Sequence, residues 1–397
     1  MRSQTQALGA VAAFSHRVST VREIGSALAR AFVLFRTGRP RPAHIEVPLD
    51  VLTAAEEAGP VRLAPPAVPA TAAVERVRAA ADVLRAARRP AVVLGGGARP
   101  ASAECRELAE ELGAPVVTTA NGKGTVAETH PLSLGVSLHS TAVQAWLGEC
   151  DAVLAVGTEL AESDLWSEPP PLKGTVIRVD VDPAQMYAGI PADVPLVGDA
   201  RESVRAVLDL LHAGSEHKEA SAAAHAHRAV TALRTSRDDE TRERDARWIP
   251  YLRAIRAVLD DDAVITSDSA QCCYYGAIPH LPMGPEGRYL HPTGFGTLGY
   301  ALPAAIGAKT ARPEKQVIAI SGDGGLQFSV QELATAVQLG LSLPVVVFDN
   351  GGYGEIREEM VARGDPPGAA ELPPVDLSAL ARAYGGRGAH AGSPQAL

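Results

Sequence analysis

The sequence predicts an α/β protein made of doubly wound parallel sheets with helices on both faces. Three observations lead to this prediction. Apolar runs of strand length recur along the chain, helical patterns separate them, and glycine or proline stands at the boundaries. The alternation occurs in residues 71–213 and again in 248–397, so we expect a central domain and a second domain of the same class. The length of 397 residues agrees with two or three domains.

Composition and charge exclude several classes of protein. Hydrophobic residues make up 46% and charged residues 21%, which is typical of globular proteins. The net charge of −9 argues against a protein that coats nucleic acid or an anionic membrane surface. No uncharged apolar run of about 18 residues indicates a membrane span. The four cysteines lack the spacing of a zinc site, so we expect reduced thiols and a cytoplasmic protein; they are Cys105, Cys150, Cys272 and Cys273.

Residues 1–52 are too few to form a domain of this class. A helical repeat of apolar residues from Val18 to Ala31 is followed by a short strand, Ala43–Val47. One helix and one strand cannot enclose a core, so we interpret residues 1–52 as the C-terminal remnant of another domain. Residues 53–70, which are rich in Ala, Pro and Glu, are expected to form a linker.

The stretch 71–213 alternates helices and strands. Helices are expected around 74–86 and 103–112, and the predicted strands are Pro90–Leu94, Pro115–Thr119, Asp151–Gly157 and, as the last one, Thr175–Asp180. Residues 214–247 contain few large apolar side chains and are expected to form a solvated helical connector. This connector carries His225 and His227, which we interpret as surface residues because no third metal ligand is evident.

The stretch from Val317 to Tyr353 has the residues of a binding site. A buried strand, Val317–Ile320, leads into Gly322-Asp323-Gly324-Gly325. A helix with apolar positions from 330 to 341 follows. A second strand, Pro344–Phe348, ends in Asp349-Asn350-Gly351-Gly352-Tyr353. In a β-α-β unit Asp323 and Asn350 then lie at the same edge of the sheet, at the ends of strands that are about 4.8 Å apart if they are neighbours. A carboxylate and an amide oxygen suit Mg²⁺, and Gly324 and Gly325 allow phosphate to approach backbone N–H groups. Each turn alone is common; the two on successive strands are more specific.

This pattern resembles the diphosphate and Mg²⁺ motif of the thiamine-diphosphate enzymes of the acetolactate synthase and 2-oxo acid decarboxylase superfamily. The resemblance implies Asp323, Asn350 and the carbonyl of Gly352 as metal ligands. It implies that the cofactor also contacts Gly322, Gly324, Gly325 and Tyr353. The family usually has Asn at the position of Asp349, and its second Asn, the metal ligand, is retained here as Asn350.

Two further stretches resemble the same family. In Gly294–Ala308, a glycine-rich loop before a helix of small residues, Leu298 matches the apolar residue that separates the two rings of the cofactor, and a backbone carbonyl near Gly296 meets the aminopyrimidine. Plain packing of helix on sheet is the alternative for this loop. In Ser267–Cys272 the resemblance implies that Gln271 reaches the diphosphate, and we give Cys272 no role.

The central stretch 71–213 resembles the Rossmann-like central domain of this family through Asn121–Gly124, Val156–Thr158 and Asp180–Pro183. Some relatives bind FAD or ADP there. The run Gly95-Gly96-Gly97 is an incomplete dinucleotide motif, so we favour a structural domain, with FAD binding as the alternative.

Residues 1–52 resemble the closing helix and strand of the family's pyrimidine-binding domain, and 248–397 its diphosphate domain without a final strand. The family's catalytic Glu lies in the pyrimidine domain, and no residue of this sequence matches it, so we name no catalytic residue. We therefore expect a chain truncated at both ends and inactive by itself. Its orphaned segment should leave large side chains partly exposed, namely Phe14, Phe32, Leu34 and Phe35.

The resemblance implies a decarboxylase that acts on a small-molecule 2-oxo acid with thiamine diphosphate and Mg²⁺, most similar to 5-guanidino-2-oxopentanoate decarboxylases. Acetolactate synthase is the alternative. An alternative from another functional class is a non-catalytic remnant that binds cofactor or a partner subunit. An NAD-linked oxidoreductase is disfavoured because the glycine motif is incomplete. Glu355 either pairs with a cationic substrate tail or stabilises a helix N-terminus. We expect a homo-oligomer, dimer or tetramer, or association with a full-length relative, and no nucleic-acid or membrane partner.

Overall fold

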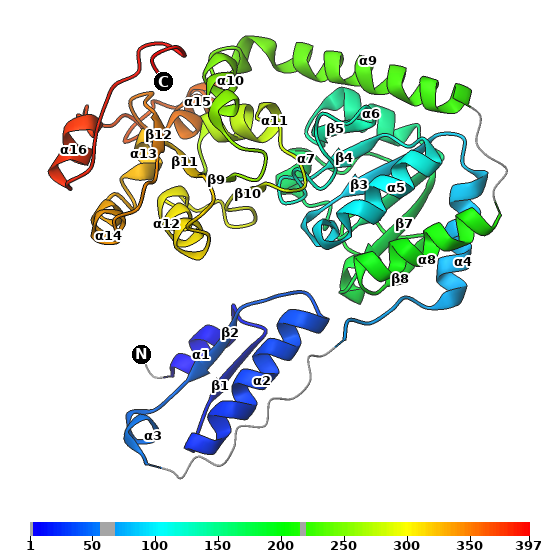
Figure 1. Cartoon of the computed structure of the whole chain (residues 1–397), viewed down its shortest axis with the longest axis horizontal. Coiled ribbons are helices and arrows are strands. Elements are labelled where there is room, and N and C mark those ends of the chain that lie inside the picture. The colour runs from blue at the N-terminus through cyan, green and yellow to red at the C-terminus, as the bar shows by residue number, and fades with distance from the viewer. Residues whose placement is uncertain (1–2, 56–67, 215–219) are drawn as a thin grey trace.

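A computed structural model describes residues 3–55, 68–214 and 220–397, without the side chains of 220–225 and 243. These residues form three parallel sheets with two, six and four strands, flanked by helices (Figure 1). The predicted fold class is therefore confirmed. Most of the predicted linker 53–70, and the side chain of His225, lie outside the described residues. No helix in the described part of the chain is long and apolar enough to cross a membrane.

The N-terminal segment is more complex than predicted. Two strands, β1 (Phe14–Arg17) and β2 (Ala43–Glu46), pair in parallel; the helices are α1 (Gln4–Gly9), α2 (Val21–Thr37) and α3 (Leu49–Thr53). The expectation of one helix and one strand was wrong, because the four residues of β1 include the polar Ser15 and His16 and show no apolar alternation.

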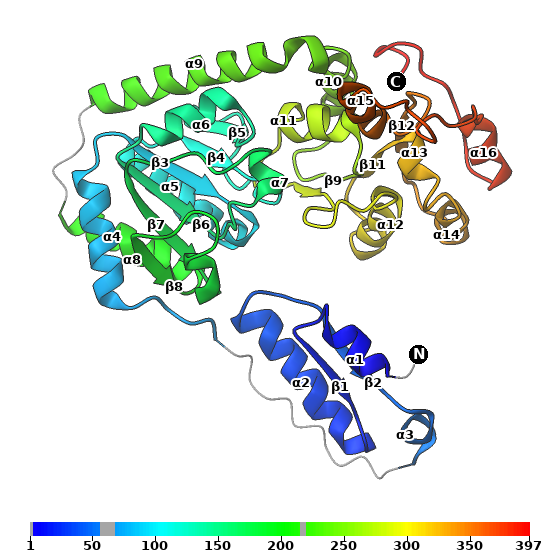
Figure 2. The same cartoon turned by 180° about the vertical axis from the view of Figure 1, so that it is seen from behind.

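This segment lies apart from the other two sheets in both views (Figures 1 and 2). Its small core contains Val18, Ala27 and Val51. Phe32 and Phe35 on α2 are 56% and 41% exposed, which confirms the exposure expected for them. Polar contacts to the central sheet region come from the loop after α2, where Arg39 pairs with Glu159 and Arg41 donates to Asp182 at 3.2 Å.

The central sheet has the strand order β5-β4-β3-β6-β7-β8. Its strands are β3 (Pro90–Leu94), β4 (Val116–Thr118), β5 (Ser133–Val136), β6 (Ala152–Val156), β7 (Thr175–Asp180) and β8 (Val194–Val197). Its helices are α4 (Val74–Ala86), η1 (Gly96–Ala101), α5 (Ser102–Leu112), α6 (Thr141–Gly148), α7 (Glu162–Leu165), η2 (Pro183–Met186) and α8 (Ala200–Ala213). Apolar side chains of α4, α5 and α8 pack on one face and those of α6 on the other, so the sheet is doubly wound.

The prediction that Thr175–Asp180 is the last strand of this sheet was wrong. β8 pairs with β7, and β5, which was not predicted, pairs with β4. Both are edge strands of four residues that contain a breaker, Pro195 in β8 and Gly135 in β5. An edge strand tolerates such residues because one side of its backbone needs no partner in the sheet.

The glycines after β3 are explained by close packing of backbones. A Cβ atom on Gly95 would lie 2.1 Å from the carbonyl oxygen of Gly157, and one on Gly157 would lie 2.5 Å from the carbonyl carbon of Gly97. Loops after β3 and β6 thus touch at a distance that no side chain permits. This contact supports the structural interpretation of the incomplete glycine motif.

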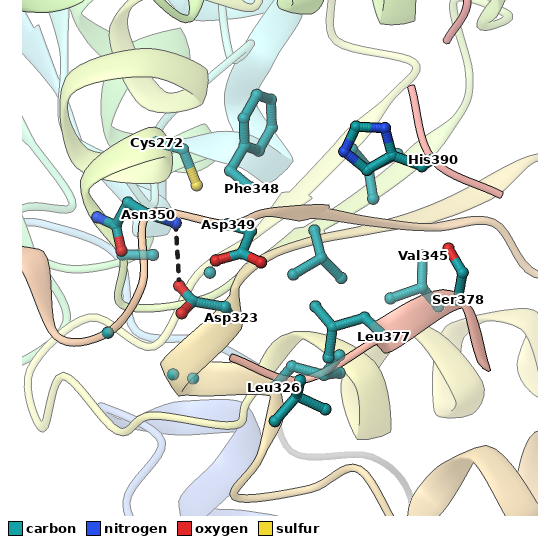
Figure 3. Close-up of a pocket in the computed structure, with 18 of the residues that line it drawn as sticks. Cys272, Asp323, Leu326, Val345, Phe348, Asp349, Asn350, Leu377, Ser378 and His390 are labelled. Atoms are coloured by element: carbon teal, nitrogen blue, oxygen red, sulfur yellow. Dashed lines mark hydrogen bonds between the residues drawn. The ribbon is translucent and has the colours of Figure 1, made fainter. Parts of the chain in front are cut away.

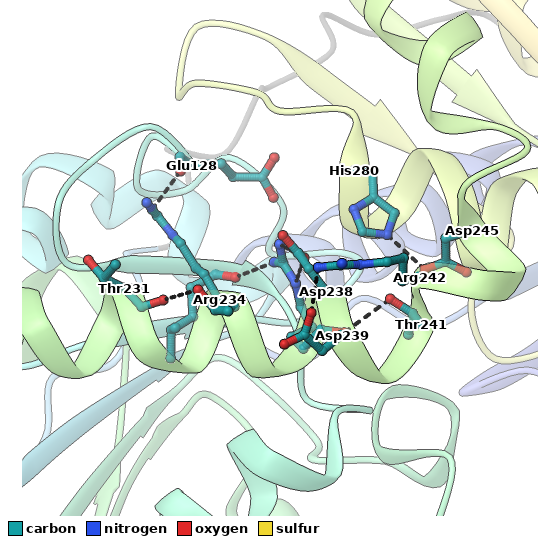
Figure 4. A network of polar contacts seen from close by, with 12 residues as sticks. Glu128, Thr231, Arg234, Asp238, Asp239, Thr241, Arg242, Asp245 and His280 are labelled. Carbon is teal, nitrogen blue, oxygen red and sulfur yellow. Dashed lines mark hydrogen bonds and ion pairs between the residues drawn. The ribbon is translucent and has the colours of Figure 1, made fainter.

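The long helix α9 (Ala220–Asp245) joins the central sheet to the next one (Figure 1). A helix was predicted here, but its fully solvated character was wrong, since Val230 is 1% exposed. Arg234 donates to the carbonyl oxygens of Glu128 and His130 at 3.0 Å each, as Figure 4 illustrates. At its end Asp245 pairs with His280 at 2.8 Å.

The third sheet has the order β10-β9-β11-β12. Its strands are β9 (Val264–Ser267), β10 (Arg288–Leu290), β11 (Val317–Gly322) and β12 (Val345–Phe348). The helices are α10 (Ile249–Val258), η3 (Cys272–Ala277), α11 (Ile278–His280), α12 (Ala301–Ala311), α13 (Asp323–Leu326), α14 (Glu332–Gln338), α15 (Gly354–Arg363) and α16 (Leu377–Ala383). The helix expected over 330–341 is shorter than its apolar pattern, because Leu339 and Gly340 end it and Leu341 packs from the following loop.

A buried ion pair joins the central region to the third sheet region. Lys123 Nζ contacts Glu128 Oε2 at 2.7 Å and also donates to the carbonyl oxygen of Ile278 at 2.7 Å. Glu128 accepts from the N–H of Met283 at 2.9 Å. Burial lowers the pKa of Lys123, while Glu128 raises it. The two buried charges are compatible with a stable fold because each contacts the other charge and also a backbone group of the third sheet region.

We expect Lys123→Met to lower stability by about 3–5 kcal/mol, because it leaves the Glu128 carboxylate buried without its cation. The measurement is the urea midpoint of the transition followed by far-UV circular dichroism. Lys173→Met is the matched control, since Lys173 and its partner Glu149 are 70% and 52% exposed. A similar shift in both variants would contradict the special role of the buried pair.

Candidate active site

The register of β11 and β12 sets the geometry of the site. Gly322 pairs with Phe348, so the residues that follow both strands emerge side by side at the same sheet edge. Asp323 begins α13 and is 6% exposed. The backbone N–H of Asn350 points at Asp323 Oδ1 from 3.4 Å, as the dashed line in Figure 3 shows. The expected proximity of Asp323 and Asn350 is therefore present.

Three oxygen atoms converge at this edge. Oδ1 of Asn350 lies 3.2 Å from Oδ1 of Asp323 and 2.9 Å from the carbonyl oxygen of Gly352. Adjacent ligands of an octahedral Mg²⁺, each about 2.1 Å from the ion, are separated by about 3 Å. The spacing of the three oxygens is that of neighbouring ligands on one cation.

The same spacing has a second explanation. If the Asn350 amide rotates by half a turn, its nitrogen donates to both Asp323 and Gly352. The oxygens of Asp323 and Gly352 can thus be stabilised either by a cation or by the Asn350 amide nitrogen. Cation binding requires the orientation in which the Asn350 oxygen faces them. Among the described residues no three His, Cys, Asp or Glu side chains form a metal cluster. A cation here would therefore have one carboxylate ligand, with amide, carbonyl and external oxygens completing its shell.

Glycines give the site its shape. Gly352 has φ = +144°, and a Cβ there would lie 2.3 Å from the carbonyl oxygen of Ala370. A Cβ on Gly324 would lie 2.8 Å from the ring of Tyr353. The loop after β12 therefore packs directly on the start of α13, which keeps the Gly352 carbonyl beside Asp323.

Burial raises the pKa of Asp323, and the nearby Asp349 carboxylate raises it further, against the N–H of Asn350, which lowers it. A cation or positively charged group between these oxygens would favour the ionised form. Asp349 is exposed, lines the same cavity as Asp323, and accepts from the N–H of Gly351 at 3.0 Å.

A second carboxylate, Asp268, holds the loops together from beneath. It is 1% exposed. It accepts from the N–H groups of Ser269 at 2.9 Å and Gly299 at 3.0 Å and from the hydroxyl of Ser321 at 2.9 Å. These donors belong to the loops after β9, before α12 and at the end of β11. Asp268 was part of a predicted motif but received no role, since its spacing from those donors in sequence gives no sign of contact.

Gln271 is a bridge between these loops and α15. Its Oε1 accepts from Asn350 Nδ2 at 3.4 Å, and its Nε2 donates to Glu355 Oε2 at 3.2 Å. The other oxygen of Glu355 accepts from the hydroxyl of Tyr275 at 2.6 Å. Both Glu355 oxygens thus have partners within the chain, and its place in the first turn of α15 agrees with a helix-stabilising role.

A cavity of about 1150 Å³ opens beside the three oxygens (Figure 3). Its lining contains every residue predicted for the metal and cofactor except Gly296: Gln271, Leu298, Gly322, Asp323, Gly324, Gly325, Asn350, Gly352 and Tyr353. Gly296 lies on a neighbouring, smaller cavity. The roles of these residues stay predictions, but the chain brings them to one place.

Comparison with known proteins agrees with this geometry. Residues 77–207 match the thiamine pyrophosphate enzyme central domain, and residues 270–397 match the C-terminal domain of that family, which binds the cofactor. An Escherichia coli acetolactate synthase isozyme 3 large subunit is 30% identical over 96% of this chain and 69% of its own length. The chain belongs to the thiamine pyrophosphate enzyme family. Thiamine pyrophosphate is the cofactor called thiamine diphosphate above.

Two other relatives are also similar to this member of the thiamine pyrophosphate enzyme family. A probable 2-ketoarginine decarboxylase of Pseudomonas aeruginosa is 39% identical over 94% of this chain and 66% of its own length. A probable acetolactate synthase large subunit of Methanocaldococcus jannaschii is 31% identical over 91% of the chain and 64% of its own length. The chain thus spans about two thirds of the length of the relatives it matches.

We expect Asp268→Asn to destabilise the thiamine pyrophosphate domain by about 1–3 kcal/mol, because the new amide NH₂ faces donors and leaves buried N–H groups unpaired. Amide hydrogen exchange at Gly299 and Ser269 should accelerate. Asp349→Asn is the control, since its exposed carboxylate accepts a single N–H that an Asn oxygen also accepts. Unchanged exchange in the Asp268 variant would refute the role given to this carboxylate.

Proposed function

We propose that this chain supplies the diphosphate-binding half of a thiamine-diphosphate-dependent 2-oxo acid decarboxylase. The observation that carries the proposal is the position of the Asn350 side-chain amide, which lies 3.2 Å from Asp323 Oδ1 and 2.9 Å from the carbonyl oxygen of Gly352, beside the glycines that open α13. When bound, thiamine diphosphate accepts the electron pair released as CO₂ leaves a 2-oxo acid. The chain's own residues would bind and orient this cofactor.

Each predicted residue has a separate task in this proposal. Asp323, Asn350 and Gly352 would bind Mg²⁺, and Gly322, Gly324 and Gly325 would leave room for phosphate oxygens. Gln271 would reach the diphosphate and Tyr353 would line it. Leu298 would separate the cofactor rings, and the Gly296 carbonyl would face the aminopyrimidine. The positions of Gly296 and Leu298 on one short loop support the last two assignments.

For the substrate we propose 5-guanidino-2-oxopentanoate, also called 2-ketoarginine. Identity to the Pseudomonas aeruginosa relative, 39%, exceeds that to the two acetolactate synthases reported above. Capture of a second carbonyl compound, as in acetolactate synthases, is the second candidate. Oligomerisation, or pairing with a subunit that carries a pyrimidine domain, is part of the proposal, and the exposed Phe32 and Phe35 support such a contact.

We expect Asp323→Asn to weaken Mg²⁺-dependent binding of thiamine diphosphate on the order of tenfold or more, since losing even an indirect partner of a metal ligand costs about that much. Isothermal titration of the 397-residue chain with and without Mg²⁺ measures it. Glu314→Gln, which also removes one negative charge but at an exposed position of the same domain outside the cavity, should bind normally. Equal affinity in the Asp323 variant and the wild type would rule out this metal site.

We further propose that these 397 residues alone turn over slowly, because no residue of this sequence matches the family's catalytic Glu. Loss of general acid–base catalysis typically costs about 10²–10⁴-fold. CO₂ release from pyruvate and from 5-guanidino-2-oxopentanoate is the measurement, at saturating cofactor and Mg²⁺. A rate of about 1 s⁻¹ or more, common among enzymes, would contradict the proposal.

A further inference from the structure

A second cavity, of about 170 Å³, lies between the central region and the third sheet region. Asp164, His139 and Trp166 line it from the central side, and His291 and Gly296 from the other. A cavity of about 150 Å³ is large enough to hold a benzene-sized ligand. The space therefore suits a small planar group.

Asp164 is a half-buried carboxylate, and among the described residues no cationic partner contacts it. It lies on α7, and its Oδ1 accepts from the N–H of Ala120 at 3.2 Å. Burial raises the pKa of Asp164 to about 6, and among the described residues the charged group that also acts on it is Glu159, which is negative. A buried carboxylate without a positive partner is unfavourable, so this side of the cavity attracts a cation.

The other walls match one kind of cation. The rings of His139 and Trp166 stack with centroids 4.3 Å apart, and Trp166 is 42% exposed. A guanidinium group is planar, pairs with carboxylates through parallel N–H groups and stacks on aromatic faces. Burial lowers the pKa of His139 and of His291 to about 4, so neither adds a competing positive charge near neutral pH.

The backbone around Asp164 is held in an uncommon conformation. Leu160 and Trp166, on either side of α7, have φ values of 52° and 57°. In the described part of the chain one other non-glycine residue, Ala369, has positive φ. Side chains rarely adopt this region, and such residues cluster where a protein positions a ligand.

The two cavities meet at the loop that was predicted to hold the cofactor. Leu298 lines the large cavity and Gly296 the small one. Ser269, also on the large cavity, lies against Gly296, where a Cβ atom would be 3.8 Å from its Oγ. The small cavity is therefore a neighbour of the large one across this loop.

We propose that Asp164 binds the cationic tail of the 2-oxo acid in this small cavity and so selects substrates that end in a guanidinium group. The proposal rests on the proposed function for the identity of the ligand. Glu355, the carboxylate that the sequence suggested for this task, already accepts from Tyr275 and Gln271. Asp164 has an oxygen free to pair with the ligand in addition to the one that accepts from Ala120.

The experiment uses the tail alone. The 397-residue chain, with Mg²⁺ and thiamine diphosphate, is titrated with n-propylguanidinium and with the neutral n-propylurea, and binding is followed by NMR of the Trp166 indole. We expect a preference for the cation of about tenfold in the wild type, equivalent to about 1.4 kcal/mol. Asp164→Asn, which keeps an acceptor for Ala120, should abolish the preference. Glu162→Gln, on the same helix but exposed, should retain it.

The pH dependence gives a second readout. Asp164 gains a proton as the pH falls through about 6, so its ionised fraction falls about tenfold from pH 7 to pH 5 and the preference should decrease from about tenfold to about twofold. Among the groups that face Asp164, His139 and His291 stay neutral over this range and Tyr274 is uncharged, while Glu159 is paired with Arg39. A preference that is absent, independent of pH, or retained in Asp164→Asn would overturn the proposal.

Titration with thiamine diphosphate separates the two proposals. Asp164→Asn should bind the cofactor as the wild type does, because Asp164 does not line the large cavity. If the wild type binds the cofactor but shows no preference for the guanidinium probe, the tail site is wrong and the proposed function stands. If the preference depends on Asp164 while the cofactor does not bind, the proposed function is wrong and the cation site stands.

Discussion

The geometry of the candidate site depends on one buried carboxylate beneath it. Asp268 receives hydrogen bonds from three loops that are far apart in sequence, through Ser269, Gly299 and Ser321. Each of these loops delivers one wall of the large cavity. Since these N–H and O–H groups donate to one buried carboxylate, the charge of Asp268 and the positions of the loops stabilise each other. The three oxygens near Asp323 lie where they do because this arrangement fixes the end of β11.

The carboxylates around the two cavities differ in whether the chain itself supplies their partners. Asp268 is satisfied entirely from within the chain, and so is Glu355. Asp323 is buried and Asp164 half-buried, each lines a cavity, and among the described residues neither has a cationic partner. Buried negative charge that the protein does not neutralise requires a ligand that does. The two cavities thus suit different ligands. The larger one suits a metal ion with phosphate, and the smaller one suits an organic cation.

Sequence patterns predicted the strands with continuous apolar character, among them β3, β6, β7 and β11, and the meeting of Asp323 with Asn350. These features follow from local periodicity and from the rule that parallel strands end at one edge. The strands β1, β5, β8 and β10 were missed because they are short and contain polar or charged residues, glycine or proline. The contacts of Asp268 and the exposure of Asp164 to a cavity depend on loops that pack across domains, and no spacing in the sequence encodes them.

The edge position of β12 has a consequence for the behaviour of the chain in solution. Its residues Val345–Phe348 are three valines and a phenylalanine, all half-buried, and within the described part of the chain no strand pairs with the outer side of β12. Such an edge is a template on which another extended segment adds by backbone hydrogen bonds. The strand ends two residues before Asn350. A strand added to this edge would therefore lie next to the loop that carries Asn350 and Gly352.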